Sequence, residues 1–191
     1  KTNIALTIRP AREVEGLITF RGQPVSGAVV QLAEAPNAGA FRKVYAGPTG
    51  VFRSMISPHT RELKLAVVAA DAPSKLVSIH VPEPGVRLTI DIGEPARIEV
   101  PAPVGVTIEH GGVVGWPGLF LPPRPGLPGA RQLPGGGIEI MVEAGWYRLC
   151  RVDGGCVDGN VPPGGSLRLS SPQDGILEEE RGVTEGQGLP A

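Results

Sequence analysis

Short segments in which apolar and polar residues alternate recur along the chain, separated by glycine and proline. This period of two is typical of β-strands that bury one face. It predicts strands in the first half near residues 13–21, 27–34, 40–46, 51–56, 61–69, 75–81 and 86–92. In the second half it predicts strands near residues 96–100, 104–109, 113–120, 137–143, 146–152, 155–160 and 165–170. We therefore expect an all-β protein with almost no helix.

Several segments carry more specific expectations. Residues 61–73 begin with alternation and end in a continuous apolar run, as in a central strand, with a short helix near 71–73 as the alternative. The strands near 75–81 and 86–92 flank a Pro-Glu-Pro-Gly turn and predict a meander. Residues 137–152, with Gly145 at a turn, look like the final hairpin of a sandwich. Residues 121–136 are too rich in proline for a sheet and predict an exposed loop.

A turn in the first half is the most specific local pattern. Gly22 and Gly27 bracket it, and Pro24 fixes one of its φ angles, while apolar residues alternate on both sides. This stretch resembles the carboxypeptidase regulatory-like (transthyretin-like) domain, whose pattern is V-x-G-x-V, then G-x-P-V-x-G-A-x-V-x-L, then T-x-x-G-x-F. The matching residues are Val14, Gly16, Ile18, Gly22, Pro24, Val25, Gly27, Ala28, Val30, Leu32, Gly50 and Phe52.

The resemblance covers roughly residues 12–92 and implies a non-catalytic binding or structural module. The Asp that the family has before its last Gly-x-Phe is absent, because this chain reads Gly47-Pro48-Thr49-Gly50-Val51-Phe52. We expect two tandem β-sandwiches of transthyretin-like or immunoglobulin-like type with an extra N-terminal strand. The expected boundaries are 1–10 for that strand, 11–93 and 94–171 for the sandwiches, and 172–191 for an acidic, glycine-rich tail.

The N-terminal segment is a complete amphipathic strand ahead of the first sandwich. Ile4, Leu6 and Ile8 share one face, and Pro10 interrupts the pattern. The strand either adds to an edge of its own subunit or is donated to a neighbouring copy, with the three apolar side chains filling successive pockets. Because donor and acceptor surfaces differ, donation would propagate as a filament unless it closes a ring.

Composition narrows the classes of function. The net charge is -1 and the basic residues are scattered, which argues against a nucleic-acid partner. The sequence contains no run of eighteen apolar residues that would predict a transmembrane segment. The chain opens at Lys1, and we interpret it as a secreted chain whose leader was removed. Cys150 and Cys156 flank an Asp-Gly hairpin tip, which predicts a disulfide and an oxidising compartment, with two reduced thiols as the alternative.

No pattern of catalytic or metal-binding residues is present in the sequence. His59, His80 and His110 are isolated from one another, and we interpret each as solvated or locally hydrogen-bonded. No cofactor is expected. The aromatic residues Trp116, Trp146 and Tyr147 are candidates for a sugar-stacking platform.

These observations favour a non-enzymatic extracellular structural subunit that assembles with copies of itself by strand addition. The alternative is a carbohydrate-binding or adhesive module of a larger secreted or surface protein, with glycan as its partner. An accessory domain of a periplasmic transporter or peptidase rests on the family resemblance alone.

Overall fold

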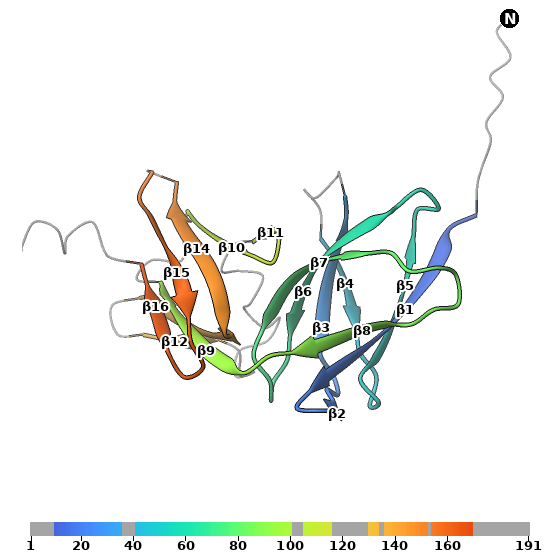
Figure 1. The fold of residues 1–191 in the computed structure, drawn as a ribbon, viewed down its shortest axis with the longest axis horizontal. Helices are drawn as coiled ribbons and strands as arrows, with labels where there is room; N and C mark the ends of the chain where they lie inside the picture. The colour runs from blue at the N-terminus through green and yellow to red at the C-terminus, as the bar shows by residue number, and fades with distance from the viewer. Residues whose placement is uncertain are drawn as a thin grey trace, which may run out of the picture.

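The computed structural model describes residues 10–35, 41–100, 105–115, 130–133, 136–152 and 154–169. Within these ranges the chain forms sixteen strands in four sheets and no helix, and the sheets stack as two β-sandwiches side by side (Figure 1). The predicted all-β class with two tandem sandwiches is therefore confirmed. The extra N-terminal strand, residues 1–9, lies outside the described residues, as do the tail 172–191 and most of the loop 121–136.

The first sandwich holds strands β1 to β8. One sheet has the order β2-β1-β5, with β8 also paired to β1, and the other has the order β4-β3-β6-β7. The bounds of the strands are β1 Arg12–Phe20, β2 Gln23–Pro24, β3 Val29–Glu34, β4 Arg42–Tyr45, β5 Val51–Ile56, β6 Glu62–Val68, β7 Lys75–His80 and β8 Leu88–Ile92.

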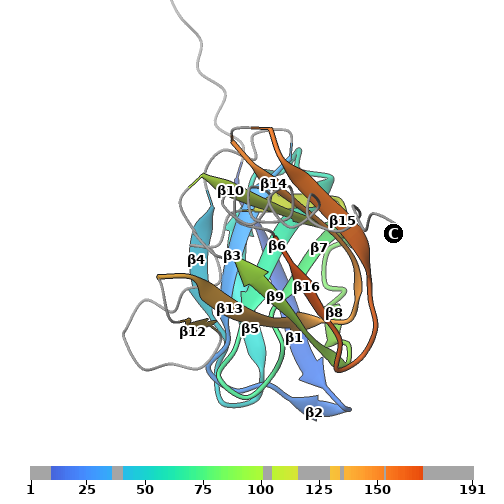
Figure 2. The same cartoon turned by 90° about the vertical axis from the view of Figure 1, so that its left-hand side faces the viewer.

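The second sandwich holds strands β9 to β16. Its two sheets have the orders β11-β10-β14-β15 and β12-β13-β9-β16, and Figure 2 shows them from the side of this sandwich. The bounds are β9 Pro95–Val100, β10 Val106–His110, β11 Val113–Gly115, β12 Ala130–Gln132, β13 Ile138–Glu143, β14 Gly145–Arg151, β15 Cys156–Val161 and β16 Ser166–Arg168.

Alternation along the strands sends every second side chain into a core. In β1, Val14 and Ile18 are buried while their neighbours are more exposed, and β8 buries Leu88, Ile90 and Ile92 in the same way. Between Val14 and Ile18 the strand has Gly16, which lies directly opposite Phe52 of β5. The Phe52 ring fills the space that a side chain at residue 16 would take, so the pair acts as one core unit.

The strand β6 is buried on both faces over its second half. Leu63, Leu65 and Val67 belong to the core of the first sandwich, whereas Ala66 and Val68 belong to a cluster formed mainly by the second sandwich. The continuous apolar run that predicted a central strand thus has a second cause, which is cover by another sandwich. The alternative of a helix near residues 71–73 is wrong, because these residues form bends between β6 and β7.

The predicted meander of the last two strands is wrong. β7 pairs antiparallel with β6, whereas β8 lies in the opposite sheet and pairs in parallel with β1, from Gly16↔Leu88 to Phe20↔Ile92. Residues 81–87 therefore cross between the sheets instead of forming a hairpin. Alternation in a sequence shows that one face of a strand is buried, but it does not show which sheet the strand joins.

Two expectations in the second half also need correction. β13 and β14 do not form a hairpin, because β13 pairs with β9 and β12 while β14 pairs with β10 and β15. Only Ala144 separates the two strands, and Gly145, at a φ of 155°, allows the sharp change of direction between sheets. The expected loop 121–136 contains strand β12, whose three residues include no proline.

Replacement of Gly16 by Ala should destabilise the first sandwich. A Cβ at this position would lie 2.2 Å from Cε1 of Phe52, which is itself 1% exposed. We expect Gly16→Ala to lower the free energy of unfolding by about 1–3 kcal/mol through overpacking. Gly47→Ala is the control, because its Cβ would have ordinary contact with the Val51 carbonyl oxygen at 3.7 Å. Equal stability of the two variants in urea denaturation would contradict this account.

Candidate functional site

The outer edge of β7 is covered by the second sandwich through backbone hydrogen bonds. The Ser74 amide donates to the Met141 carbonyl at 2.9 Å, and the Glu143 amide donates to the Ser74 carbonyl at 3.0 Å. Farther along the same edge, the Ser78 amide donates to the Gly111 carbonyl at 2.9 Å. An edge strand normally leaves such groups to solvent. Here the second sandwich satisfies these groups at Ser74 and Ser78, although none of its strands pairs with β7 in the sheet.

Apolar contacts join the two sandwiches beside this edge. Ala66, Val68 and Leu76 of the first sandwich are buried in one cluster with the core of the second, which includes Ile108 and Val142. A buried apolar contact of this kind resists separation of the two units, since separation would expose the side chains to water. The junction between the sandwiches is therefore the most extensively built site among the described residues.

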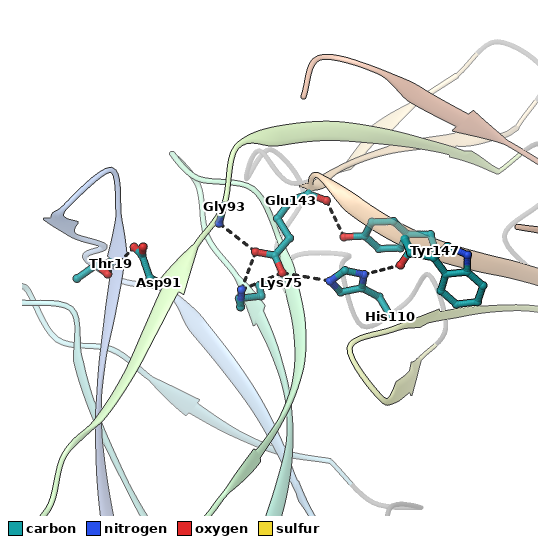
Figure 3. Close-up of polar contacts among 8 residues, drawn as sticks. Thr19, Lys75, Asp91, Gly93, His110, Glu143 and Tyr147 are labelled. Carbon is teal, nitrogen blue, oxygen red and sulfur yellow. Dashed lines mark hydrogen bonds and ion pairs between the residues drawn. The ribbon is translucent and has the colours of Figure 1, made fainter. Parts of the chain in front are cut away.

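A buried carboxylate lies at the centre of the junction (Figure 3). Glu143, at the end of β13, is 6% exposed. Its oxygens accept hydrogen bonds from Lys75 Nζ at 2.7 and 2.9 Å and from the Gly93 amide at 2.9 Å, and Oε1 lies 3.2 Å from His110 Nε2. Lys75 belongs to the first sandwich, Gly93 to the connection and His110 to the second, so one side chain links all three parts.

His110 is held from both sides of its ring. Nε2 faces Glu143, and Nδ1 lies 2.7 Å from the backbone carbonyl oxygen of Trp146. The ring stacks on Tyr147 with centroids 4.2 Å apart. Both polar neighbours of the ring are oxygen acceptors. The expectation that His110 is solvated or bonded locally is wrong, since its side chain is 13% exposed and its partners are distant in sequence.

The surroundings of Glu143 set its protonation. Burial raises the pKa of its carboxyl, but the hydrogen bonds from His110, Lys75 and the Gly93 amide outweigh burial, so the pKa lies below its ordinary value of 4.5. The pKa of Tyr147 shifts in the opposite direction. Burial, followed by the charge of Glu143, raises the pKa of its phenol, and the hydroxyl donates to the Glu143 carbonyl at 2.8 Å. Tyr147 is therefore a neutral structural donor.

The predicted disulfide is confirmed. Cys150 on β14 and Cys156 on β15 are directly opposite each other in the ladder, with Cα atoms 4.1 Å apart, and their sulfur atoms are bonded. The hairpin connecting them places Gly154 at a φ of 105°. The disulfide thus closes the tip of this hairpin, away from the Glu143 junction at the other end of β14.

The predicted aromatic platform is only partly described. Trp146 is 46% exposed on β14, but Tyr147 faces the other way and is 1% exposed. Tyr147 therefore belongs to the core and does not present a stacking face beside Trp146. Trp116 lies outside the described residues, as do Ile4, Leu6 and Ile8.

The junction does not resemble a catalytic centre in its geometry. His110 bonds to a carboxylate and a carbonyl oxygen, so neither ring nitrogen faces a nucleophile that it could activate. Within the ranges that the structure describes, no three His, Cys, Asp or Glu side chains gather as ligands for a metal ion. The same ranges contain no helix long and apolar enough to cross a membrane. The chemistry of the junction is that of a structural ion pair.

Comparisons with known proteins give only distant likenesses. No protein-family model matches the chain, and no curated protein sequence matches it either. Among solved structures, it is similar to the Bacillus anthracis TIE protein (11% identity, TM-score 0.34, 83% of this chain and 33% of that one) and to a Streptococcal ancillary pilin (10%, 0.35, 83% and 61%). It is also similar to a DUF3823 family protein from Bacteroides ovatus ATCC 8483 (11%, 0.35, 78% and 91%).

The chain spans about a third of the TIE protein and about three fifths of the ancillary pilin.

Protonation of Glu143 should weaken the junction. Because its folded-state pKa is depressed, its contribution to stability is fully present above pH 4.5 and is lost as the pH falls through the folded value. We expect the free energy of unfolding to fall below pH 4.5, and we expect Glu143→Gln to flatten that dependence. At neutral pH, Glu143→Ala should cost roughly 2–4 kcal/mol, because Lys75 loses its partner.

The measurement is urea denaturation at a series of pH values, and Glu139→Gln is the matched control. Glu139 lies on the same strand with an exposed partner, Arg131. A Glu143→Gln variant that keeps the full acid dependence of the wild type would contradict the assignment.

Proposed function

We propose that the chain is a non-enzymatic structural subunit of an extracellular assembly, joined to its neighbours by strand addition of residues 1–9. The observation that carries the proposal is the junction, which fixes two sandwiches as one unit through the covered edge of β7 and the buried Glu143. A subunit of a regular filament needs such a fixed orientation of its two sandwiches. Any variation in their relative orientation within each copy would accumulate along a chain of repeated heterologous contacts.

Open sheet edges in the first sandwich support strand addition. Within the described residues, β5 and β8 each pair with β1 alone, so each leaves one edge without a partner strand. Such an edge offers main-chain donors and acceptors to an incoming strand. The alternating Ile4, Leu6 and Ile8 of a donor would extend the apolar face of the sheet that it joins.

The disulfide supports an oxidising compartment. Cys150 and Cys156 are bonded, and there is no other cysteine in the sequence. Bonds of this kind persist in secreted and surface proteins and are rare in the reducing cytosol. A surface or secreted location agrees with a structural role in an extracellular assembly.

Loss of the apolar face of the N-terminal segment should abolish assembly. We expect the full-length chain to form polymers, seen by negative-stain electron microscopy and light scattering, and we expect the combined variant Ile4→Ser, Leu6→Ser, Ile8→Ser to remain monomeric. The reason is that the donor would lose the side chains that fill the acceptor. The thermal midpoint of the variant should equal that of the wild-type monomer.

The matched control changes the opposite face of the same segment, through Asn3→Ser, Ala5→Ser and Thr7→Ser, and should still assemble. If the apolar-face variant instead lowers the stability of the monomer, the segment is an edge strand of its own subunit and the proposal of donation fails. Dispersed particles from the wild-type chain would also contradict the proposal.

A second candidate function, glycan binding, is favoured by the exposed indole of Trp146. An aromatic face of this kind can stack on a sugar ring. If it does, Trp146→Ala should weaken saturable binding to a glycan array by about tenfold, corresponding to a loss of ~1.4 kcal/mol. Tyr45→Ala is the control, because Tyr45 is an exposed aromatic residue of the first sandwich. Equal binding by both variants would exclude Trp146 as the contact.

A further inference from the structure

A cationic cleft lies at the end of the first sandwich where β1 begins. It has a volume of about 510 Å³ and is lined by Arg12, by residues 58–61 of the β5–β6 connection and by His80 and Val81 at the end of β7. Two backbone hydrogen bonds fix these segments, from the Thr60 amide to the Ser57 carbonyl and from the Val81 amide to the Arg61 carbonyl. The cleft is therefore built by three segments that converge on one another.

The lining of this cleft contains two guanidinium groups and no carboxylate. Arg12, Arg61, His59 and His80 contribute to the lining, which contains no Asp or Glu. Among the described residues, neither Arg12 nor Arg61 takes part in an ion pair. A cleft with one sign of charge concentrates counter-ions of the opposite sign.

Two carboxylates close to the cleft in sequence or in the ladder, Glu34 and Glu13, have partners elsewhere. Glu34 accepts the Ser57 amide at 2.9 Å and the Thr60 hydroxyl, and it pairs with Arg42 at 3.3 Å. Glu13 faces Arg53 on the neighbouring strand. These partners orient the two carboxylates toward other cations, so they leave the guanidinium groups of the cleft available.

One donor of the cleft is buried without a partner. Arg12 Nε is shielded from solvent and makes no hydrogen bond. A buried donor left unpaired is costly, and guanidinium nitrogens match the oxygen pairs of carboxylate and phosphate groups. In the sequence, the segment that ends at Arg12 is basic, because residues 1–12 contain Lys1, Arg9 and Arg12 and no acidic residue.

We propose that this cleft binds an oxyanion, a carboxylate or phosphate group held by Arg12 and Arg61 with His59 and His80 beside it. Its volume falls in the range of small-ligand pockets, which is about 300–1,000 Å³. The group belongs to a small organic or inorganic anion, or to the acidic segment of another copy, where Glu178, Glu179 and Glu180 follow one another in the sequence. The site lies apart from the junction and does not depend on strand addition.

The chain has three histidines, which makes the cleft directly observable by NMR. The ring protons of His59 and His80 should shift on titration with citrate or inorganic phosphate at low ionic strength and constant pH, and the shifts should saturate. His110, which is partly buried at the junction, is the internal reference, and its ring protons should not shift. A synthetic peptide of residues 174–185 forms a second arm of the titration.

Combined replacement Arg12→Gln and Arg61→Gln should weaken binding by about tenfold or more, because the charge-assisted hydrogen bonds are lost. The matched control, Arg97→Gln and Arg168→Gln, removes two exposed guanidinium groups from the second sandwich and should bind as the wild type does. Tighter binding of the peptide than of citrate identifies another copy as the source of the anion, and the reverse identifies a small anion.

Three results would overturn the proposal: no shift with any probe, equal shifts at His59, His80 and His110, or unchanged affinity in the Arg12→Gln, Arg61→Gln variant. The titration tests the cleft alone, so a negative result would not contradict the proposal of strand addition. Conversely, a chain that stays monomeric would not contradict the proposal of anion binding in the cleft.

Discussion

The edge of β7 is the constraint on which the rest of the structure depends. The amides and carbonyls of an edge strand that is covered by another unit lose their water and need protein partners, and here the second sandwich provides them at Ser74 and Ser78. Once this edge is paired, the outer face of β6 is covered as well, and the Glu143 carboxylate is drawn into a dry environment. Its three donors then become necessary, because an unpaired buried charge would oppose the same contact.

Much of the fold could be predicted from the sequence because burial on one face leaves a period of two. Strands β1, β3, β5 and β6 begin and end within about two residues of the expected bounds, and the Cys150–Cys156 pair follows from its hairpin spacing. Pairing between distant strands was not predictable, because alternation does not show which other strand a given strand pairs with. The parallel contact of β8 with β1 and the change of sheet at Gly145 depend on that missing information.

The junction was not predictable as a site, although one signal pointed toward it. Lys75, His110 and Glu143 are isolated in sequence, and each is of a type that is usually solvated. Their proximity depends on how one sandwich lies against the other. The signal was the apolar run after Lys64, which buries both faces of β6 and therefore requires a second covering layer. The cationic cleft could not be predicted from periodicity, because it is formed by the ends of two strands and by one turn.

The separation in sequence between paired strands has a consequence for synthesis of the chain on the ribosome. β1 cannot pair with its parallel partner β8 until residue 92 has left the ribosome. The edge of β7 stays uncovered until residues 111 and 141–143 have also been synthesised. Pairings over such distances are slow and leave strand edges exposed in the meantime. A truncated or stalled product that ends before β13 would thus leave the outer edge of β7 unpaired. Such a product is prone to aggregate with other copies of itself.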